Sequence, residues 1–290
     1  MKKIISIVGT TASGKSGLGV ELAKHFDGEI ISADSRQVYK HLDIGSGKIT
    51  KDEMNGVRHH LIDVACPFVV SGKESAFSLA KYLDLAYKAI DDVLARGKLP
   101  FLVGGTGMYS RAIVEGYSLR SGQGGEQGGE QYVQEQVSGQ GKQGDEHSNK
   151  PRFNCLQLGL TYEKDVLHKR IETRLDKRLC KENGLIGEVE SLLNRGISKD
   201  FLLALGLEYK LTSQYLAGYF DSFKIKNLSE FDEINKCAYK KYRSELFKEI
   251  RRFAKRQLTW YAKEKQLIWL DTTKNYTQQA KTLITEFLNK

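Results

Sequence analysis

A phosphate-binding motif lies near the start of the chain, where residues 4–16 read IISIVGTTASGKS. Four residues separate Gly9 from Gly14, and Lys15 and Ser16 follow directly. Glycines let the backbone curl so that several N–H groups point at phosphate oxygens, and the N-terminus of the next helix adds partial positive charge. Lys15 supplies a mobile positive charge, and the Ser16 hydroxyl can bind Mg²⁺. The sequence therefore predicts a binding site for a di- or triphosphate.

A second polar cluster, DSRQVY at residues 34–39, follows an apolar segment typical of a buried strand. An aspartate at a strand end beside a phosphate loop can hold Mg²⁺ through water or accept a proton from an attacking nucleophile. It can also simply cap the next turn. Position alone leaves these three interpretations of Asp34 open.

A third cluster, GGTG at residues 104–107, follows the apolar segment PFLV. Its glycines allow a ligand to approach the backbone closely, and Thr106 offers a hydroxyl. Glycines at strand ends are also common turn residues, so this cluster by itself is weak evidence for a site.

Two further clusters carry charge without a clear role. Arg170 and Arg174 are four residues apart on one face of a helical segment, where they could clamp a phosphate or form ion pairs with Glu172 and Asp176. The pair His59-His60 has no further metal ligand at suitable spacing, and we interpret it as the polar approach to a strand.

Short apolar runs alternate with helical patterns along the chain and define the elements that must position these clusters. The runs predict strands at 4–8, 29–33, 60–64, 100–103, 153–160 and 266–270. Helical patterns cover 18–26, 75–96, 164–181, 186–195, 201–220, 230–265 and 276–288. This order predicts an α/β fold like that of P-loop NTPases: a parallel sheet flanked by helices, with a mostly helical C-terminal half. Ligands bind such sheets beyond the carboxyl ends of the strands, where all three polar clusters fall.

Residues 118–150 differ in kind from the rest. The stretch 121–150 contains eight glycines and seven glutamines, and Tyr132, Val133 and Val137 are its only sizeable apolar residues. Such a segment buries too little surface to offset the entropy of ordering it. We expect a flexible linker at 118–150 between two parts of one core, 1–117 and 151–290.

Composition limits the class of protein. Of the 290 residues 40% are apolar, and no apolar stretch reaches membrane-spanning length. Four scattered cysteines, none in a C-x-x-C pair, indicate reduced thiols in a cytoplasmic protein. The net charge is +9, and residues 236–256 contain nine Lys or Arg with interleaved aromatics. This stripe suits a nucleic-acid backbone, or else it belongs to a solvated amphipathic helix whose aromatics face the core.

Taken together, these segments resemble the tRNA dimethylallyltransferase family of bacterial type, whose members prenylate adenine 37 of the anticodon loop. The matching segments, in family order, are GTTASGKS (9–16), DSRQVYKHLDIGSGK (34–48), HHLIDV (59–64), PFLVGGTGMY (100–109), HKRIETRLDKRL (168–179), ALGLEYK (204–210) and FAKRQLTWY (253–261). Two positions depart mildly: Thr10 stands where proline is usual, and Gly47 where alanine is usual.

The resemblance implies a role for each cluster. The phosphate loop would hold the diphosphate of dimethylallyl diphosphate together with Mg²⁺. Ser16 would bind the metal, and Arg174 would also bind the diphosphate. Asp34 would accept the proton of the adenine N6 as that nitrogen attacks the allylic carbon, and Thr106 would contact the same nucleotide. The residues implied to bind the diphosphate are Gly9, Thr11, Ala12, Ser13, Gly14, Lys15 and Ser16. Those implied to contact tRNA are Asp34, Ser35, Arg36, Gln37, Thr106 and Arg256.

The main departure from the family is at 118–150, where a longer helical insert normally grips the anticodon stem-loop. We therefore expect diphosphate binding to be preserved and tRNA affinity to be weakened, in a protein that we expect to be a monomer. Three alternatives are a P-loop small-molecule kinase, an adenylate isopentenyltransferase and a non-catalytic RNA-binding relative. The basic stripe favours RNA over a free nucleotide, and the intact Lys15, Asp34 and Arg174 favour an enzyme.

Overall fold

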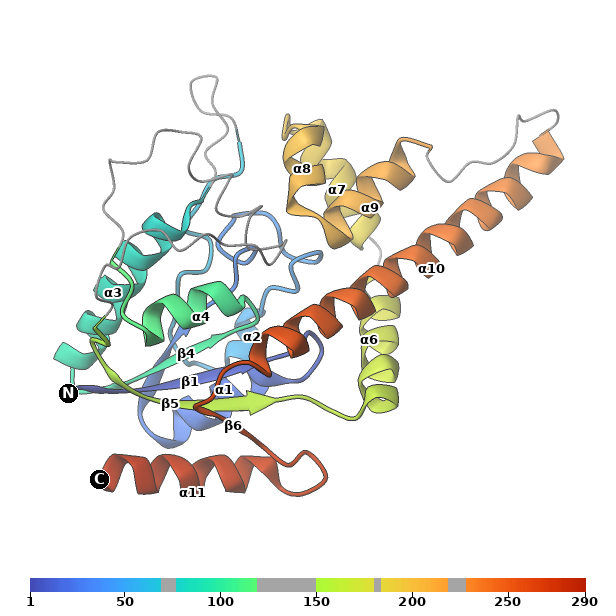
Figure 1. Ribbon diagram of the computed structural model, residues 1–290. Coiled ribbons are helices and arrows are strands. Elements are labelled where there is room, and N and C mark those ends of the chain that lie inside the picture. Colours follow the sequence, from blue (N-terminus) through green and yellow to red (C-terminus); the bar gives the residue numbers. More distant parts are fainter. Residues whose placement is uncertain (69–76, 119–149, 180–183, 219–227) are drawn as a thin grey trace.

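The computed structural model describes residues 1–68, 77–118, 150–179, 184–218 and 228–290, with the backbone alone described at 228–235. Its centre is a six-stranded parallel sheet in the order β3-β2-β4-β1-β5-β6 (Figure 1). The strands are β1 (Lys3–Gly9), β2 (Gly28–Ser32), β3 (His59–His60), β4 (Leu99–Gly104), β5 (Asn154–Leu160) and β6 (Leu267–Trp269). The predicted α/β class with a parallel sheet is therefore confirmed.

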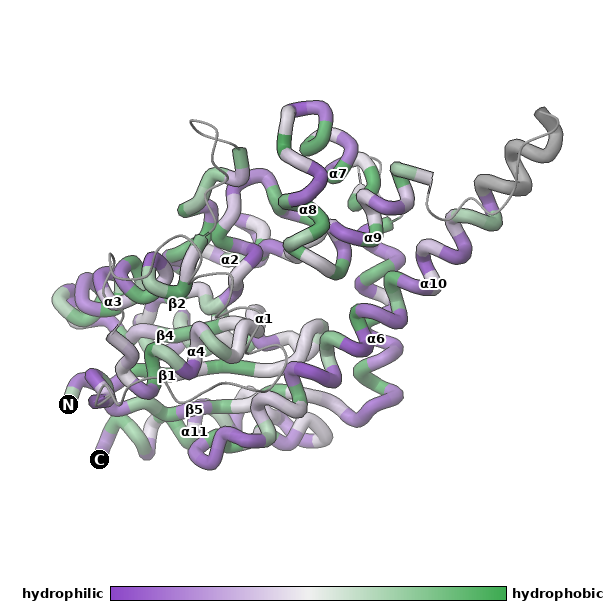
Figure 2. The backbone as a smooth tube through the Cα atoms, turned by 45° about the horizontal axis from the view of Figure 1, so that its top comes forward, coloured by the Kyte–Doolittle hydropathy of each residue, from purple (hydrophilic) through white to green (hydrophobic). Residues whose placement is uncertain are grey.

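Helices cover both faces of the sheet, as expected for parallel strands. On one face lie α1 (Lys15–His25) and α11 (Tyr276–Asn289), and on the other α3 (Leu79–Ala95), α4 (Gly107–Val114) and part of α10 (Leu228–Tyr261). Alternation along β1 serves both cores: Ile5 and Ile7 pack in the cluster that contains α1 and α11, and Ile4 packs in the other. Hydrophobic residues along the strands are visible in Figure 2.

The C-terminal half adds a group of helices beyond the carboxyl ends of the strands: α6 (Lys164–Leu179), α7 (Leu185–Asn194), α8 (Lys199–Leu205) and α9 (Leu207–Leu216). The long helix α10 runs from the sheet past α6 and packs against α9 (Figure 1). Tyr242, Leu246 and Ile250 of α10 are buried in the larger core cluster. Through α10 the helical group is joined to the sheet.

The strand predicted at 60–64 is wrong beyond its first residue. β3 comprises only His59 and His60, and Leu61 and Asp63 then adopt positive φ angles of 63° and 58°. The chain then pairs in parallel with the segment after β2, where the N–H of Ala65 donates to the carbonyl of Val38 at 2.8 Å. Because tertiary hydrogen bonds override the local apolar pattern, a strand prediction from pattern alone fails here.

The helix predicted at 201–220 is two helices. Gly206, with φ 70°, separates α8 from α9, and residues 219–220 lie outside the described part. Two short helices were not predicted: α2 (Lys51–Met54) and α4, which begins inside the GGTG cluster. The linker predicted at 118–150 lies outside the described residues, except for its first and last residue. The start of the helix predicted at 75–96 and the end of the helix predicted at 164–181 also lie outside them.

Three smaller predictions can be checked in the described residues. Cys66, Cys155 and Cys237 are free thiols, while Cys180 lies outside the described part. Among the helices described, none is both long and apolar enough to cross a membrane. His59 and His60 were interpreted as the polar approach to a strand, but they form β3 themselves, and His60 contacts the buried carboxylate of Glu29 at 2.8 Å.

Candidate functional site

The phosphate loop joins β1 to α1 at the carboxyl edge of the sheet. A Cβ on Gly9 would lie 2.1 Å from the carbonyl oxygen of Leu160, so only glycine fits between β1 and β5. Gly14 has φ 92° and caps α1. The hydroxyl of Ser13 is buried and has no hydrogen-bond partner in the described part. A buried donor without a partner at a helix N-terminus is what an anion site requires.

Lys15 is the cation of this loop. Its ammonium group donates to the carbonyl of Thr10 at 3.3 Å. Burial lowers the pKa of Lys15 to about 8; the carboxylate of Asp34 opposes this shift, and the guanidinium of Arg174 adds to it. Three charged side chains from β1–α1, the loop after β2 and α6 therefore lie within electrostatic reach of one another.

Asp34 caps the turn after β2, which was one of the three roles that its position in the sequence left open. Its Oδ1 accepts hydrogen bonds from the backbone N–H groups of Arg36, at 3.0 Å, and Gln37, at 3.4 Å. Oδ2 accepts none from the described residues. The cap fixes the direction of the carboxylate and leaves one oxygen for a ligand.

Thr106 ties the second glycine-rich loop to the Asp34 turn. Its Oγ1 accepts from the backbone N–H of Ser35 at 2.9 Å and lies 3.3 Å from the Ser35 hydroxyl. A Cβ on Gly104 would lie 2.0 Å from the carbonyl oxygen of Ala33, so glycine permits this close approach of β4 to β2. The two polar clusters therefore form one surface.

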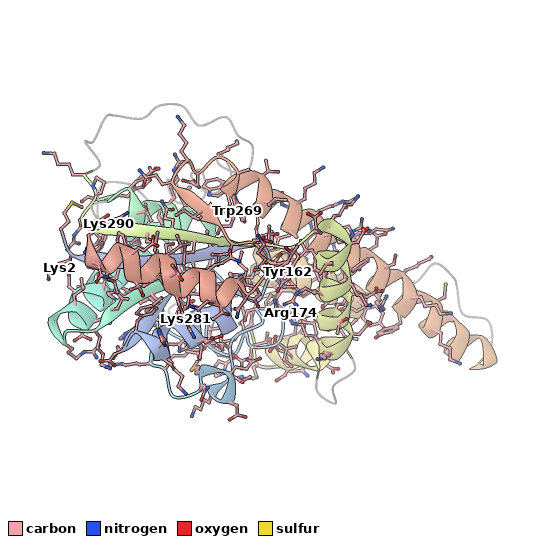
Figure 3. All side chains as sticks on the ribbon, turned by 90° about the horizontal axis from the view of Figure 1, so that it is seen from below. Lys2, Tyr162, Arg174, Trp269, Lys281 and Lys290 are labelled. Carbon is pink, nitrogen blue, oxygen red and sulfur yellow. The ribbon has the colours of Figure 1, made fainter. Side chains whose placement is uncertain are left out.

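The interpretation of Arg170 and Arg174 as partners of Glu172 and Asp176 is wrong, because Arg243 of α10 takes both carboxylates. Arg170 instead donates to the carbonyl of Ala12 in the phosphate loop at 2.8 Å and lies 4.4 Å from the ring centroid of Tyr162. Figure 3 shows Tyr162 and Arg174 at the same end of the sheet.

Arg174 has no carboxylate partner in the described part of the chain; it donates to the carbonyl of Gly47 at 3.4 Å. Burial, helped by the neighbouring Arg178, lowers the pKa of Arg174 to about 10 against the opposing carboxylates of Glu208 and Asp34. A partly buried guanidinium without a counter-ion beside a phosphate loop is suited to bind a diphosphate.

A buried carboxylate that the sequence did not single out holds Arg36. Glu208 of α9 is 5% exposed and forms ion pairs with Arg36 at 3.0 Å and Arg178 at 3.1 Å. The guanidinium of Arg36 also lies 5.5 Å from the ring of Phe253, and that of Arg256 lies 5.9 Å from the same ring. Arg36 and Arg256, both predicted to contact tRNA, are thus neighbours although they are 220 residues apart in the sequence.

Gln257, in the KRQLTW motif, is a second residue without a predicted role. Its Oε1 accepts from the N–H of Thr11 at 2.7 Å, and its Nε2 donates to the carbonyl of Gly105 at 2.8 Å. The only sequence signal for Gln257 was its place in a matching segment.

The amphipathic-helix interpretation of the basic stripe is confirmed in part, and its role toward a nucleic acid stays a prediction. Tyr242 is fully buried, and Arg243, Lys248 and Arg252 pair with carboxylates, as expected of an amphipathic helix. Four cations of the stripe are exposed and pair with no carboxylate in the described part: Lys236, Lys240, Lys255 and Arg256. Of these four, Arg256 lies near Arg36, since both guanidinium groups lie against the ring of Phe253.

A family model described as IPP transferase matches residues 37–146 and 131–264. The chain belongs to the IPP transferase family. It is 32% identical to the tRNA dimethylallyltransferase of Acetivibrio thermocellus, over 93% of this chain and 92% of the relative. It is 34% identical to that of Carboxydothermus hydrogenoformans, over 98% and 97%. The resemblance seen in the motifs is therefore confirmed.

Solved structures of IPP transferases have the same fold. The tRNA isopentenylpyrophosphate transferase of Bacillus halodurans, 32% identical, superposes with a TM-score of 0.74 over 100% of this chain and 98% of that one. The enzyme of Staphylococcus epidermidis, 26% identical, gives 0.73 over 100% and 99%. A eukaryotic dimethylallyltransferase acting on tRNA, 21% identical, gives 0.71 and supports the fold alone.

The residues present fit Mg²⁺ bound mainly through a substrate. The described part of the chain contains no group of three or more His, Cys, Asp or Glu side chains that could hold a metal ion. Mg²⁺ usually takes one or two protein ligands together with phosphate oxygens and water. Ser16, in the first turn of α1, makes no side-chain hydrogen bond to another described residue, so its hydroxyl is available as such a ligand.

Proposed function

We propose that this protein transfers the dimethylallyl group of dimethylallyl diphosphate to N6 of adenine 37 in tRNA anticodon loops and releases diphosphate. We further propose that it works in the cytoplasm as a monomer, with weakened tRNA affinity because the family's helical insert is replaced at 118–150. Membership in the family supports the reaction. The proximity of Lys15, Asp34 and Arg174 at one edge of the sheet carries the assignment of roles.

The cations bind the leaving group. Lys15, the amides of the loop and the unpartnered hydroxyl of Ser13 would hold one side of the diphosphate, and Arg174 the other. Mg²⁺, held by Ser16, would neutralise part of the charge on the diphosphate. Fixed cations aimed at the departing oxygen lower the barrier to breaking the C–O bond.

The free oxygen of Asp34 would take the proton. As N6 attacks the allylic carbon, a C–N bond forms, the C–O bond to diphosphate breaks with its electron pair, and the N6 proton passes to Oδ2. Thr106 and Ser35 would hold this nucleotide, and Arg36, Gln37 and Arg256 the surrounding RNA. An anticodon loop offers an adenine that can leave its stack at low cost.

Transfer of labelled dimethylallyl from its diphosphate to unmodified tRNA with adenine at position 37 tests the proposal. Asp34→Asn keeps the oxygen that caps Arg36 and Gln37 and removes the base. We expect the rate to fall by about 10²- to 10⁴-fold, which is the usual contribution of a general base. The matched control is Asp84→Asn, which changes an exposed carboxylate on α3. Wild-type transfer that Asp34→Asn leaves intact would contradict the role of Asp34. Phosphate transfer from ATP to a small molecule, with no prenyl transfer, would favour the kinase alternative.

A further inference from the structure

The loop between Asp43 and Lys48 is fixed from outside by one carboxylate. Glu188 of α7 accepts three successive backbone N–H groups: those of Asp43 at 2.9 Å, Ile44 at 2.6 Å and Gly45 at 3.0 Å. The hydroxyl of Tyr209 donates to the same carboxylate at 3.0 Å. Glu188 thus takes up four donors, and charge-assisted bonds of this kind are among the stronger ones in proteins.

Tyr209 continues this arrangement by one residue. Its hydroxyl accepts the N–H of Ser46 at 3.0 Å, and its ring fills the space in which Gly45 lacks a side chain, since a Cβ there would lie 2.6 Å from the ring. Burial and the Glu188 carboxylate raise the pKa of the fully buried Tyr209 well above its ordinary value, so it remains a neutral hydroxyl. Together, Glu188 and Tyr209 bind every backbone N–H from 43 to 46.

The far end of this loop contacts the site. The carbonyl of Gly47 accepts from the guanidinium of Arg174 and from the side-chain amide of Gln37, each at 3.4 Å. Arg174 is the proposed diphosphate ligand, and Gln37 a proposed tRNA ligand. One carbonyl therefore orients a side chain for each substrate, and Glu188 and Tyr209 fix the loop that carries this carbonyl.

We propose that Glu188 is a positioning residue for prenyl transfer: by holding loop 43–47 it sets Arg174 for the diphosphate and Gln37 for the RNA. The inference rests on the proposed function. A row of N–H groups is also a typical site for a phosphate, but here the carboxylate of the chain itself fills it, which excludes an RNA phosphate at the same donors.

Glu188→Gln tests the proposal because an amide presents N–H groups to some of the backbone donors that the carboxylate accepts. Its control is Glu190→Gln, which changes an exposed carboxylate on the same helix. The Glu190 carboxylate has no hydrogen bond or ion pair within the described part. We expect Glu188→Gln to raise the KM for dimethylallyl diphosphate and for tRNA by about tenfold each, which corresponds to about 1.4 kcal/mol. Glu190→Gln should match the wild type.

A double-mutant cycle separates positioning from mere stabilisation. The affinity for inorganic diphosphate, measured by calorimetry, should fall in Glu188→Gln and in Arg174→Ala, and Glu188→Gln should cause no further loss in the protein that already carries Arg174→Ala. Additive losses, or a lower melting temperature with unchanged affinity, would overturn the inference.

A second variant, Tyr209→Phe, tests the inference if Glu188→Gln does not fold. A rise of several-fold in both KM values would support the inference, and unchanged KM values would overturn it. If the wild type transfers no prenyl group, the proposed function is contradicted. If the wild type is active and Glu188→Gln has the same KM values, only this inference is contradicted.

Discussion

The side-chain oxygen of Gln257 accepts a hydrogen bond from the backbone N–H of Thr11 at 2.7 Å, across 246 residues of sequence. This bond joins α10 to the phosphate loop, and the amide nitrogen of the same side chain joins it to Gly105. A single residue on the helix that carries the basic stripe therefore fixes both glycine-rich loops.

Gln257→Leu should uncouple these loops. The N–H of Thr11 and the carbonyl of Gly105 would lose their partner, and we expect a loss of about 2 kcal/mol in the free energy of unfolding in urea, because unpaired buried polar groups are costly. Diphosphate affinity should fall as well, since the loop would be less well fixed. Gln266→Leu makes the same change at an exposed position and should leave both quantities near the wild-type values.

The pKa of Lys15, about 8, predicts how diphosphate binding depends on pH. Binding needs the charged ammonium, so affinity should be constant well below pH 8 and about tenfold weaker one pH unit above it. Calorimetry with inorganic diphosphate across this range checks the prediction. Lys15→Met should bind weakly with no break near pH 8, and a break that survived this change would belong to another group.

The same shift has a consequence for stability. The pKa of Lys15 is lower in the folded protein than its ordinary value of 10.5, so the folded state binds fewer protons than the unfolded state between these two values. The cost of burying the charge is fully present below pH 8 and disappears as the pH rises toward 10.5. Chemical unfolding of the wild type and of Lys15→Met should therefore converge over this interval.

Gly47→Ala should disturb the diphosphate site of this protein, although alanine is usual at this position in the family, because two arginine side chains here occupy the space beside Gly47. Gly47 has φ 62°, and a Cβ there would lie 2.1 Å from the guanidinium of Arg174 and 1.8 Å from that of Arg178. Both side chains would have to move, so we expect the KM for dimethylallyl diphosphate to rise several-fold. Gly56→Ala separates backbone strain from crowding, because Gly56 has φ 79° with nothing within 4 Å of its added Cβ. Both variants should lose about 1 kcal/mol of stability, but only Gly47→Ala should change the KM.

Glu29 should make stability sensitive to acid. This residue, 5% exposed, pairs with Arg96 at 2.7 Å and contacts His60, and the hydrogen bonds from Arg96 are the main reason that the pKa of Glu29 falls to about 2. The stabilisation is complete above the ordinary pKa of 4.5 and is lost as the pH falls toward 2. We expect Glu29→Gln to cost about 2 kcal/mol near neutral pH, allowing for solvent around Arg96, and the difference from the wild type to shrink in acid. Asp92→Asn, at an exposed partner of Arg96, should cost less stability than Glu29→Gln, because ion pairs at the surface are weak.

Local patterns predicted the parts of the molecule that depend on local sequence. The phosphate loop and most strands have their own apolar runs and glycines, and the structure places them as expected. The turn after β3 and the start of α4 were not predicted, because hydrogen bonds to segments distant in the sequence determine them. Glu188, Glu208 and Gln257 were not assigned a role for the same reason. Each acts on a loop that is at least 140 residues away in the sequence, and no spacing rule links such pairs.

The position of β1 in the sheet also bears on biosynthesis. β1 is made before the other strands of the sheet, yet its neighbours are β4, which begins at Leu99, and β5, which begins at Asn154. About a third of the chain must therefore be synthesised before one edge of this apolar strand can pair. About half must be synthesised before the second edge can pair. Nascent chains of this protein should depend on chaperones that shield such edges until the second half of the chain has been made.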